Sequence, residues 1–316
     1  MRALADGWGL AAGALRYAPV GGGSYHWVVA DDQRKQWFVT VDDLDDKGWL
    51  GRTRPAVLAG LRAAMQAAVT LRREAGLGFV VPPVPARDGQ PVLPLGNRHA
   101  IAVFPFLHGV PGRWEEGLPV RDRAELVAML AALHRADPAA VRLPRPEFGL
   151  SWRDDLEAAL RELDRPWTGG PFAEPARSLL TAAAVPIRQR LDTLDRWAGH
   201  APVPAGTVIT HGEPHPGNLI RAAGGEVMLI DWDTVGLARP ERDLWMVATE
   251  TGGELRRYTE LTGRPVDPAA LELYRLRWAL DDIACFVRDL RAPHGRTPGA
   301  EHAWAALELA VAKLTR

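Results

Sequence analysis

Cysteine is almost absent from this chain, and so are an excess of charge of one sign and any long apolar run. The single cysteine, Cys285, cannot form an internal disulfide, which fits a reducing compartment. The 38 basic and 39 acidic residues nearly cancel, so the positive surface typical of nucleic-acid binding is missing. No stretch is apolar enough to span a bilayer, and the first thirty residues lack the apolar run of a signal peptide. We therefore expect a cytoplasmic protein with no nucleic-acid or membrane partner.

Several common site motifs are also missing. The chain has no GxxxxGK[ST] phosphate loop and no Rossmann glycine pattern. His211 and His215 have the spacing of a zinc pair, but Gly212, Pro214 and Pro216 exclude the helix that a zinc-protease motif requires. Nucleotide or metal chemistry must therefore come from a different arrangement.

The predicted secondary structure changes along the 316-residue chain. The first hundred predict short strands around one main helix, and the remainder is mostly helical with a small strand island. The predicted strands are Leu15–Val20, Tyr25–Ala30, Gln36–Asp42, Val92–Leu95, Ala100–Leu107, Val208–Thr210 and Val227–Asp231. The predicted helices include Pro55–Glu74, Ala124–Arg135, Trp152–Leu163 and Ala176–Trp197. A chain of this length can form two lobes. The mixture of predicted strands and helices indicates an α+β fold.

The segment from His211 to Asp233 carries the most chemistry. A loop with a carboxylate and an amide, Glu213 and Asn218, is followed after a short hairpin by Asp231 and Asp233. A kinase needs hard oxygen ligands to hold a divalent metal on a nucleoside triphosphate, and it needs an acceptor for the substrate hydroxyl proton. Two acid-bearing loops beside one hairpin can supply both.

This segment strongly resembles the catalytic loop and metal-binding segment of the aminoglycoside phosphotransferase and choline kinase family. The resemblance implies a bilobal protein-kinase-like fold, with an antiparallel N-terminal lobe over residues 1–107 and a mostly helical C-terminal lobe over residues 108–316. It also implies ATP or GTP and Mg²⁺ as cofactors. Carried over by position, Glu213 is the catalytic base, Asn218 and Asp231 ligate the metal, and Asp233 adds a metal contact.

The resemblance extends beyond this segment. It implies that His211 is a packing residue and that Asp243, in the run Arg242–Leu244, braces the catalytic loop. It further implies a nucleotide site formed by a glycine turn, a third-strand position and an interlobe hinge. The residues at these places are Gly21, Gly22, Gly23, Ser24, Thr40, Phe104 and Phe106. The segments Leu4–Gly9 and Gly22–Trp27 are similar to the spectinomycin phosphotransferase branch.

Two positions depart from the family pattern. The usual catalytic Asp is Glu213, whose extra methylene shifts the carboxylate by roughly 1.5 Å, a misplacement that can cost about 100-fold in rate. Thr40 occupies the third-strand position where the family places a phosphate-binding Lys. Glu74, the acid on the following helix, then lacks its expected partner, and Lys35 or Lys47 would have to reach in from a loop.

Four carboxylates in predicted helices of the second lobe suggest how the acceptor is recognised. Asp154, Asp155, Asp281 and Asp282 fall in the segments that correspond to the family's substrate-binding part, where they predict a pocket for a cation; their ordinary role is that of solvated helix charges. We expect a phosphotransferase acting on a hydroxyl of a small polar molecule, for instance an aminocyclitol or aminoglycoside antibiotic in a resistance role. A pseudokinase-like binding protein and a metabolic small-molecule kinase stay open as alternatives. The sequence makes no prediction of oligomeric state.

Overall fold

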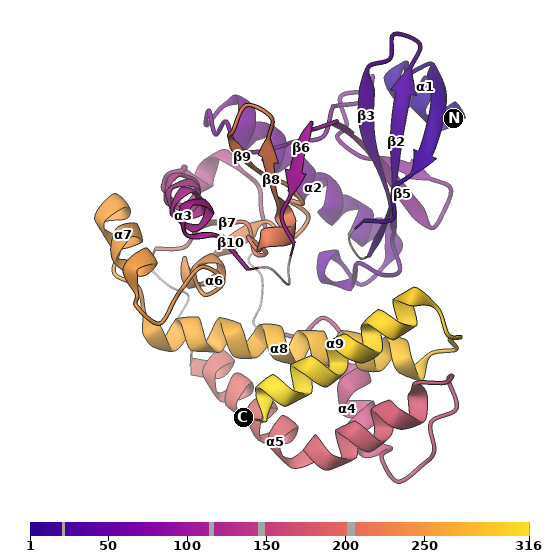
Figure 1. Cartoon of the computed structure of the whole chain (residues 1–316), viewed down its shortest axis with the longest axis vertical. Helices are drawn as coiled ribbons and strands as arrows, with labels where there is room; N and C mark the ends of the chain where they lie inside the picture. Colours follow the sequence, from indigo (N-terminus) through magenta and orange to yellow (C-terminus); the bar gives the residue numbers. More distant parts are fainter. Residues whose placement is uncertain (21–22, 114–116, 145–148, 201–205, 316) are drawn as a thin grey trace. The chain divides into compact units, whose positions relative to one another are not determined.

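The computed structural model describes residues 1–20, 23–113, 117–144, 149–200 and 206–315 (Figure 1). The chain divides into two units, each built from two stretches of sequence. The first comprises Met1–Pro146 and Gly206–Val266, and the second comprises Glu147–Ala205 and Asp267–Arg316. The segment His211–Asp233 therefore belongs to the same unit as the N-terminal sheet. A lobe boundary after residue 107 stays a prediction.

A five-stranded antiparallel sheet forms the N-terminal part of the first unit, in the order β1-β2-β3-β5-β4. Its strands are β1 (Ala12–Tyr17), β2 (Ser24–Asp31), β3 (Gln36–Asp43), β4 (Leu93–Leu95) and β5 (His99–Pro105). The three predicted N-terminal strands form the expected meander, although the first begins and ends three residues earlier than predicted. On β3, Thr40 pairs with His26 of β2 and Ala102 of β5.

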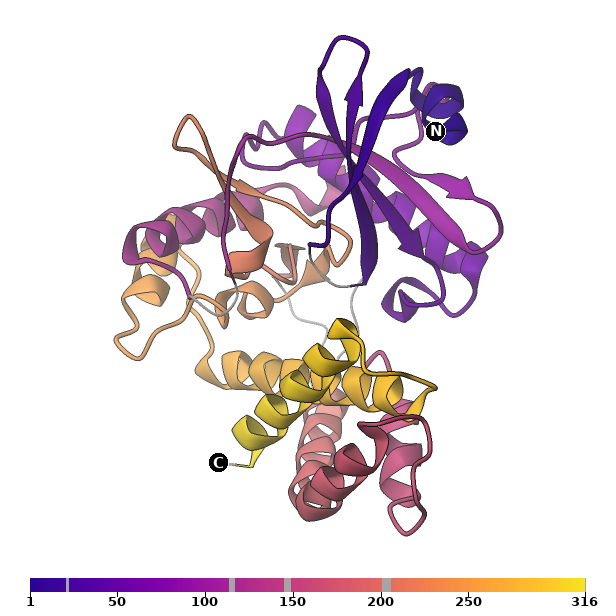
Figure 2. The same cartoon turned by 45° about the vertical axis from the view of Figure 1, so that its right-hand side comes forward.

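One long helix, α2 (Arg54–Arg73), packs on this sheet (Figure 2). Thr53 caps its start by accepting a hydrogen bond from the Ala56 N–H, and Pro55 fits the first turn. Its buried residues Val57, Leu61 and Met65 contact a cluster that includes Ala100, Ala102 and Phe104 of β5. The helix ends at Arg73, so Glu74 is its exposed C-cap rather than an acid on the helix. A short helix that the sequence did not predict, α1 (Arg2–Trp8), precedes the sheet.

The rest of the first unit carries small strand pairs and helices. The strand β7 (Val208–Thr210) pairs with β10 (Gly236–Ala238), and β8 (Leu219–Ala222) pairs with both β6 (Gly109–Pro111) and β9 (Val227–Leu229). The helices here are α3 (Val120–Arg135), α6 (Glu241–Leu244) and α7 (Gly253–Thr262). Short 3-10 turns cover Gly48–Leu50 (η1), Pro138–Ala140 (η3) and Pro216–Asn218 (η4). The predicted strand to Asp231 ends two residues early, because Asp231 adopts a left-handed backbone with φ of 62°.

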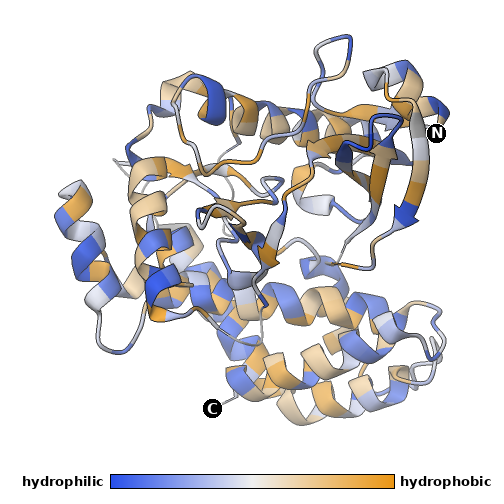
Figure 3. Ribbon diagram, turned by 45° about the horizontal axis from the view of Figure 1, so that its top comes forward, coloured by the Kyte–Doolittle hydropathy of each residue, from blue (hydrophilic) through white to orange (hydrophobic). Residues whose placement is uncertain are grey.

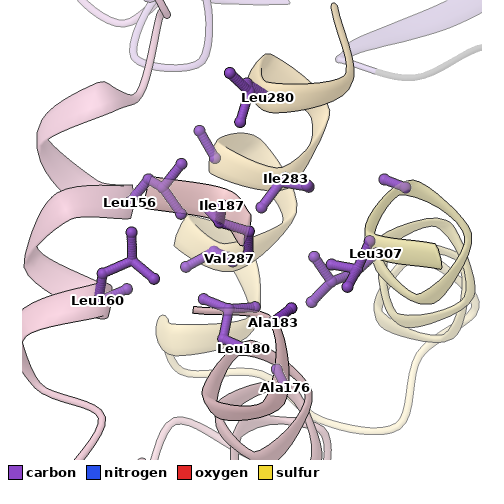
Figure 4. Packing of buried hydrophobic residues seen from close by; sticks show 14 of the residues in the cluster. Leu156, Leu160, Ala176, Leu180, Ala183, Ile187, Leu280, Ile283, Val287 and Leu307 are labelled. Carbon is purple, nitrogen blue, oxygen red and sulfur yellow. The ribbon is translucent and has the colours of Figure 1, made fainter. Parts of the chain in front are cut away.

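The second unit is helical in its described residues. It contains α4 (Arg153–Arg161), α5 (Ala173–His200), α8 (Pro268–Arg291) and α9 (Pro298–Leu314). Hydrophobic and hydrophilic stretches alternate along these helices (Figure 3), as amphipathic packing requires. Leu156, Leu180, Ile187, Ile283 and Leu307, all fully buried, lie in one core built from all four helices (Figure 4). Among the described residues of both units, no helix has the length and apolar character needed to cross a membrane.

Candidate active site

The predicted catalytic loop begins where β7 ends, and its first residue is held by backbone groups. The buried ring of His211 donates from Nε2 to the Ile230 carbonyl (2.9 Å) and accepts at Nδ1 from the Glu213 N–H (3.2 Å). These two partners define its tautomer. Burial lowers the pKa of His211 to about 4, so the ring is neutral at neutral pH. Trp232 packs its ring edge-to-face on His211, with the centroids 4.7 Å apart. His211 thus ties the catalytic loop to the segment after β9.

Asp243 on α6 holds the first two residues of the same loop through hydrogen bonds. Its two carboxylate oxygens accept the backbone N–H groups of His211 (2.8 Å) and Gly212 (2.7 Å), and Oδ2 also accepts from His134 Nε2 (3.0 Å). Burial would raise the pKa of Asp243, but the His134 hydrogen bond and the charge of Arg242 outweigh it and hold the pKa below the usual value. The carboxylate is therefore ionised, and both of its oxygens accept hydrogen bonds.

Gly212 is required by the packing of Arg242. With φ of 101°, Gly212 adopts a backbone that side chains disfavour, and a Cβ here would collide with the Arg242 guanidinium. Arg242 itself donates to Thr210 Oγ1 (2.7 Å) and to the Thr234 carbonyl (2.8 Å). The close approach lets one Arg connect the strand before the loop to the segment after Asp233.

Glu213 and Asn218 are brought together within the loop. The Asn218 side-chain Nδ2 donates to the Glu213 carbonyl oxygen (2.9 Å), which leaves Oδ1 as the acceptor atom of this amide. Asn218 is buried on η4, while the Glu213 side chain is half-buried. Burial, with added repulsion from Asp233 and Asp231, raises the pKa of Glu213 to about 8. A carboxylate with this pKa is suited to accept a proton near neutral pH.

Asp231 and Asp233 follow β9 in two different environments. Asp231 is exposed and has a left-handed backbone, a conformation that Asp tolerates better than most residues and that often marks functional sites. Asp233 is only 6% exposed. Its Oδ2 lies 2.6 Å from the ammonium of Lys47. The two carboxylates therefore offer one accessible ligand and one held by an ion pair.

The donor set is suited to Mg²⁺. Asp231, Asp233 and Asn218 Oδ1 supply hard oxygens, and Mg²⁺ usually binds through one or two carboxylates and completes its shell with waters and phosphates. No group of three or more His, Cys, Asp or Glu side chains within the described ranges could hold a metal by itself.

Of the two candidate lysines, Lys47 is the one that contacts a predicted metal ligand, Asp233. It is 4% exposed, and its ammonium pairs with Asp42 (3.1 Å) at the end of β3 as well as with Asp233. Lys35 is exposed instead and lies over the Trp37 ring, 4.2 Å from its centroid. Thr40, on β3 itself, is half-buried and its Oγ1 lies 3.3 Å from His26 Nδ1.

The remaining predicted nucleotide residues are only partly described. Gly21 and Gly22 lie outside the described residues. Gly23 has φ of 78°, with no atom within 4 Å of where a Cβ would be, and Ser24 Oγ donates to Asp42 Oδ1 (2.6 Å). Phe104 packs on the α2 cluster from β5, and Phe106 contacts His108 edge-to-face just beyond that strand. The structure thus brings Ser24 into the Lys47 network and leaves the two phenylalanines near the predicted hinge.

The four predicted acceptor carboxylates all lie in the second unit and differ from one another. Asp281 Oδ1 accepts the Ser151 backbone N–H (2.7 Å), and its Oδ2 lies 3.5 Å from Arg277, so it helps to fix the start of α4. Asp282 is half-buried, and burial together with the charge of Asp281 raises its pKa to about 7. Asp154 is exposed and Asp155 half-buried on the first turn of α4.

With this geometry described, the comparisons with known proteins identify the family. The sequence model of the phosphotransferase enzyme family matches residues 18–275. The chain belongs to this family. It is a kinase-like phosphotransferase, and the α+β kinase-like fold predicted from the sequence is confirmed.

Individual relatives are more distant. Protein StrN of Streptomyces griseus is 27% identical over 238 residues, which is 71% of this chain and 69% of that protein. Spectinomycin phosphotransferase APH(9)-Ia, in a structure with ADP and spectinomycin, superimposes with a TM-score of 0.76 at 17% identity, covering 99% of this chain and 96% of that one. The amicoumacin kinase hAmiN, with AMP-PNP, Ca²⁺ and Ami, gives 0.59 at 14% identity, covering 99% and 91%. At these identities the structures establish the fold of this phosphotransferase.

Some residues of the site have no distinctive sequence signal. Asp42 lies in an acidic run that resembles an ordinary loop, and Tyr258 donates or accepts at His134 Nδ1 (2.9 Å) from 124 positions away. The sequence pattern on α3 favours a satisfied core histidine at His134, and this is what its two buried hydrogen bonds make it. Only the tertiary contacts connect these residues to the catalytic loop.

Proposed function

We propose that this phosphotransferase transfers the γ-phosphoryl group of ATP or GTP to a hydroxyl of a small cationic molecule of the aminocyclitol or aminoglycoside type. The observation that carries the proposal is the Glu213 carboxylate. It has a raised pKa, its main chain is tied to Asn218, and it lies beside the carboxylates of Asp231 and Asp233. A base next to a set of oxygen metal ligands is the arrangement that phosphoryl transfer to a hydroxyl needs.

In the proposed reaction the acceptor hydroxyl oxygen forms a bond to the γ-phosphorus, and the bond from that phosphorus to the bridging oxygen breaks. Glu213 takes the hydroxyl proton, and the nucleoside diphosphate leaves. His211 and Asp243 hold the loop that carries Glu213 from two sides. These two residues position the base and do not touch the reactants.

The nucleotide and metal contacts follow from the same geometry. Asn218, Asp231 and Asp233 would hold Mg²⁺, which neutralises charge on the phosphates when bound. The turn from Gly21 to Ser24 would cover the phosphates, Thr40 would face them from β3, and Phe104 and Phe106 would contact the base. The ADP and AMP-PNP bound in the similar spectinomycin phosphotransferase and amicoumacin kinase structures support a nucleotide as the cosubstrate.

For the acceptor, the carboxylates of the second unit favour a cation. Asp154, Asp155 and Asp282 supply negative charge on α4 and α8, while Asp281 is largely committed to Ser151 and Arg277. Several carboxylates on one part of the surface give a negative potential that favours a cation. Spectinomycin in the structure of APH(9)-Ia is an acceptor of the proposed class, and resistance to such an antibiotic would be the biological role.

The test is nucleotide turnover with Mg²⁺ across aminocyclitols, aminoglycosides, nucleoside antibiotics and small neutral alcohols. We expect diphosphate release that depends on a cationic acceptor, with the phosphorylated product found by mass spectrometry. Turnover only with a neutral alcohol would refute the acceptor class and favour a metabolic kinase. Nucleotide binding with no turnover on any acceptor would refute transfer and favour a pseudokinase, the outcome suggested by Glu213 and Thr40.

A further inference from the structure

The inner face of β3 offers no cation to a triphosphate. Thr40 is neutral and lies against His26, and the pKa of His26 is lowered by burial, so that ring is neutral too. Nearby, Asp42, Asp231 and Asp233 add negative charge. A tetra-anionic nucleotide in this environment needs a positive side chain in addition to a divalent metal.

Lys47 is the cation that the structure places here. Its ammonium is buried between Asp42 (3.1 Å) and Asp233 (2.6 Å), and Asp231 is close enough to stabilise its charge. Lys47 thus joins the end of β3 to the segment that follows β9.

The number of charges in this cluster indicates more than a structural ion pair. One ammonium lies among the carboxylates of Asp42, Asp231 and Asp233, so the carboxylates outnumber the cation. A lysine ammonium has three N–H donors. Among the described residues, one N–H is donated to Asp233 (2.6 Å), while Asp42 forms an ion-pair contact at 3.1 Å and the centroid of the Trp49 ring lies 5.2 Å from the ammonium. Buried ion pairs also contribute little net stability compared with apolar packing, so stability alone does not explain this one.

The link to the glycine turn strengthens the case. Ser24 is the last residue of the turn predicted to cover the phosphates. Its Oγ donates to Asp42 Oδ1 (2.6 Å), and the same oxygen contacts Lys47. One chain of contacts therefore runs from Ser24 through Asp42 and Lys47 to Asp233. It joins the predicted phosphate-covering turn to the predicted metal ligands.

We propose that Lys47, supplied by the loop after β3, is the phosphate-binding cation of this enzyme and replaces a lysine at Thr40. The proposal rests on the nucleotide site proposed above. An ammonium proton not donated to Asp233 would be donated to an α- or β-phosphate oxygen, while the ion pairs with Asp42 and Asp233 hold the side chain in place.

The test compares dissociation constants of Mg-ADP and of adenosine by calorimetry, with folding checked by thermal melts. Lys47→Met should weaken ADP by roughly 10- to 100-fold, which is what one charge-assisted hydrogen bond contributes, and leave adenosine within about 3-fold. If Lys47→Met does not fold, the double variant Asp42→Asn with Lys47→Met replaces it, because it also removes the buried negative charge that loses its Lys47 partner. The matched control, Lys35→Met, removes an exposed lysine outside the site and should change neither ligand.

A rescue completes the design. Adding Thr40→Lys to Lys47→Met should restore much of the ADP affinity, because the charge returns from the strand. Equal ADP binding by the wild type and both Lys47→Met proteins would overturn the assignment, as would equal losses for ADP and adenosine, which indicate general damage. A wild-type chain that binds neither ligand would instead refute the proposed nucleotide site itself, so the two failures are distinguishable.

Discussion

Replacing Asp243 with Ala should strongly destabilise the first unit and disable the catalytic loop at the same time. The change removes the acceptor of three buried donors, the N–H groups of His211 and Gly212 and the Nε2–H of His134. Leaving a buried donor without a partner costs about 1–3 kcal/mol. After allowance for partial relaxation, we expect a loss of roughly 3–6 kcal/mol, a large share of the 5–15 kcal/mol typical of a folded domain.

The assay is thermal and urea unfolding, with kinetics measured well below the melting temperature. For a unit of this size, each kcal/mol lowers Tm by about 2 °C, so the variant should melt roughly 6–12 °C lower. Asp243→Asn should fall between, because its amide keeps one acceptor oxygen but turns a donor toward Gly212 or His211. Asp32→Ala, which removes an exposed loop carboxylate, is the control and should stay within about 0.5 kcal/mol.

The pH dependence adds an independent check. Because the folded pKa of Asp243 lies below its usual value, its contribution is present above about pH 4, the unfolded value, and is lost as pH falls through the lower folded pKa. The stability gap between wild type and Asp243→Ala should therefore be constant near neutrality and shrink only in acid. By the same scaling, a melting temperature within about 2 °C of the wild-type value would mean a loss of only about 1 kcal/mol, which would refute the bracing role.

Four further substitutions test the site. Glu213→Gln should lower kcat by about 100-fold or more and leave nucleotide affinity unchanged. Wild-type activity should rise with pH toward about 8 as Glu213 loses its proton, and a bound cation would move the midpoint lower. A rate that falls over about pH 6–8 would contradict the role of Glu213 as a base. Asp231→Asn should weaken Mg-nucleotide binding at least about 10-fold and metal-free nucleotide far less, and equal effects would remove Asp231 from the metal site. In the wild type the acceptor KM should fall as pH rises through about 7, where Asp282 gains its charge. Asp282→Asn should abolish this fall and raise the acceptor KM at low salt. Asp281→Asn should instead lower the Tm, because Asp281 accepts the Ser151 N–H.

Local patterns in the sequence predict the class of fold, which is confirmed, and a candidate site between His211 and Asp233. Glycine and proline around His211 exclude a helix, and the acids and amide from Glu213 to Asp233 are close in sequence, so any hairpin there brings them together. The amphipathic spacing of α2 and the alternation along β2 and β3 are equally local signals. Element ends were less accurate, since Asp231 takes a left-handed backbone that no apolar pattern reveals.

The long-range contacts depended on tertiary structure. Lys47 and Asp233 are 186 positions apart, and Asp243 meets His134 across 109. Sequence spacing carries no information on such pairs, so Lys35 and Lys47 were equivalent until folding buried one and left the other on Trp37. Asp281 likewise resembles a free helix charge until Ser151, 130 positions away, donates its backbone N–H to it. The sequence determined which chemical groups this protein has; the folded chain decided which of them have charged or hydrogen-bonded partners, because a charge is stabilised or repelled only by what lies within a few ångströms of it.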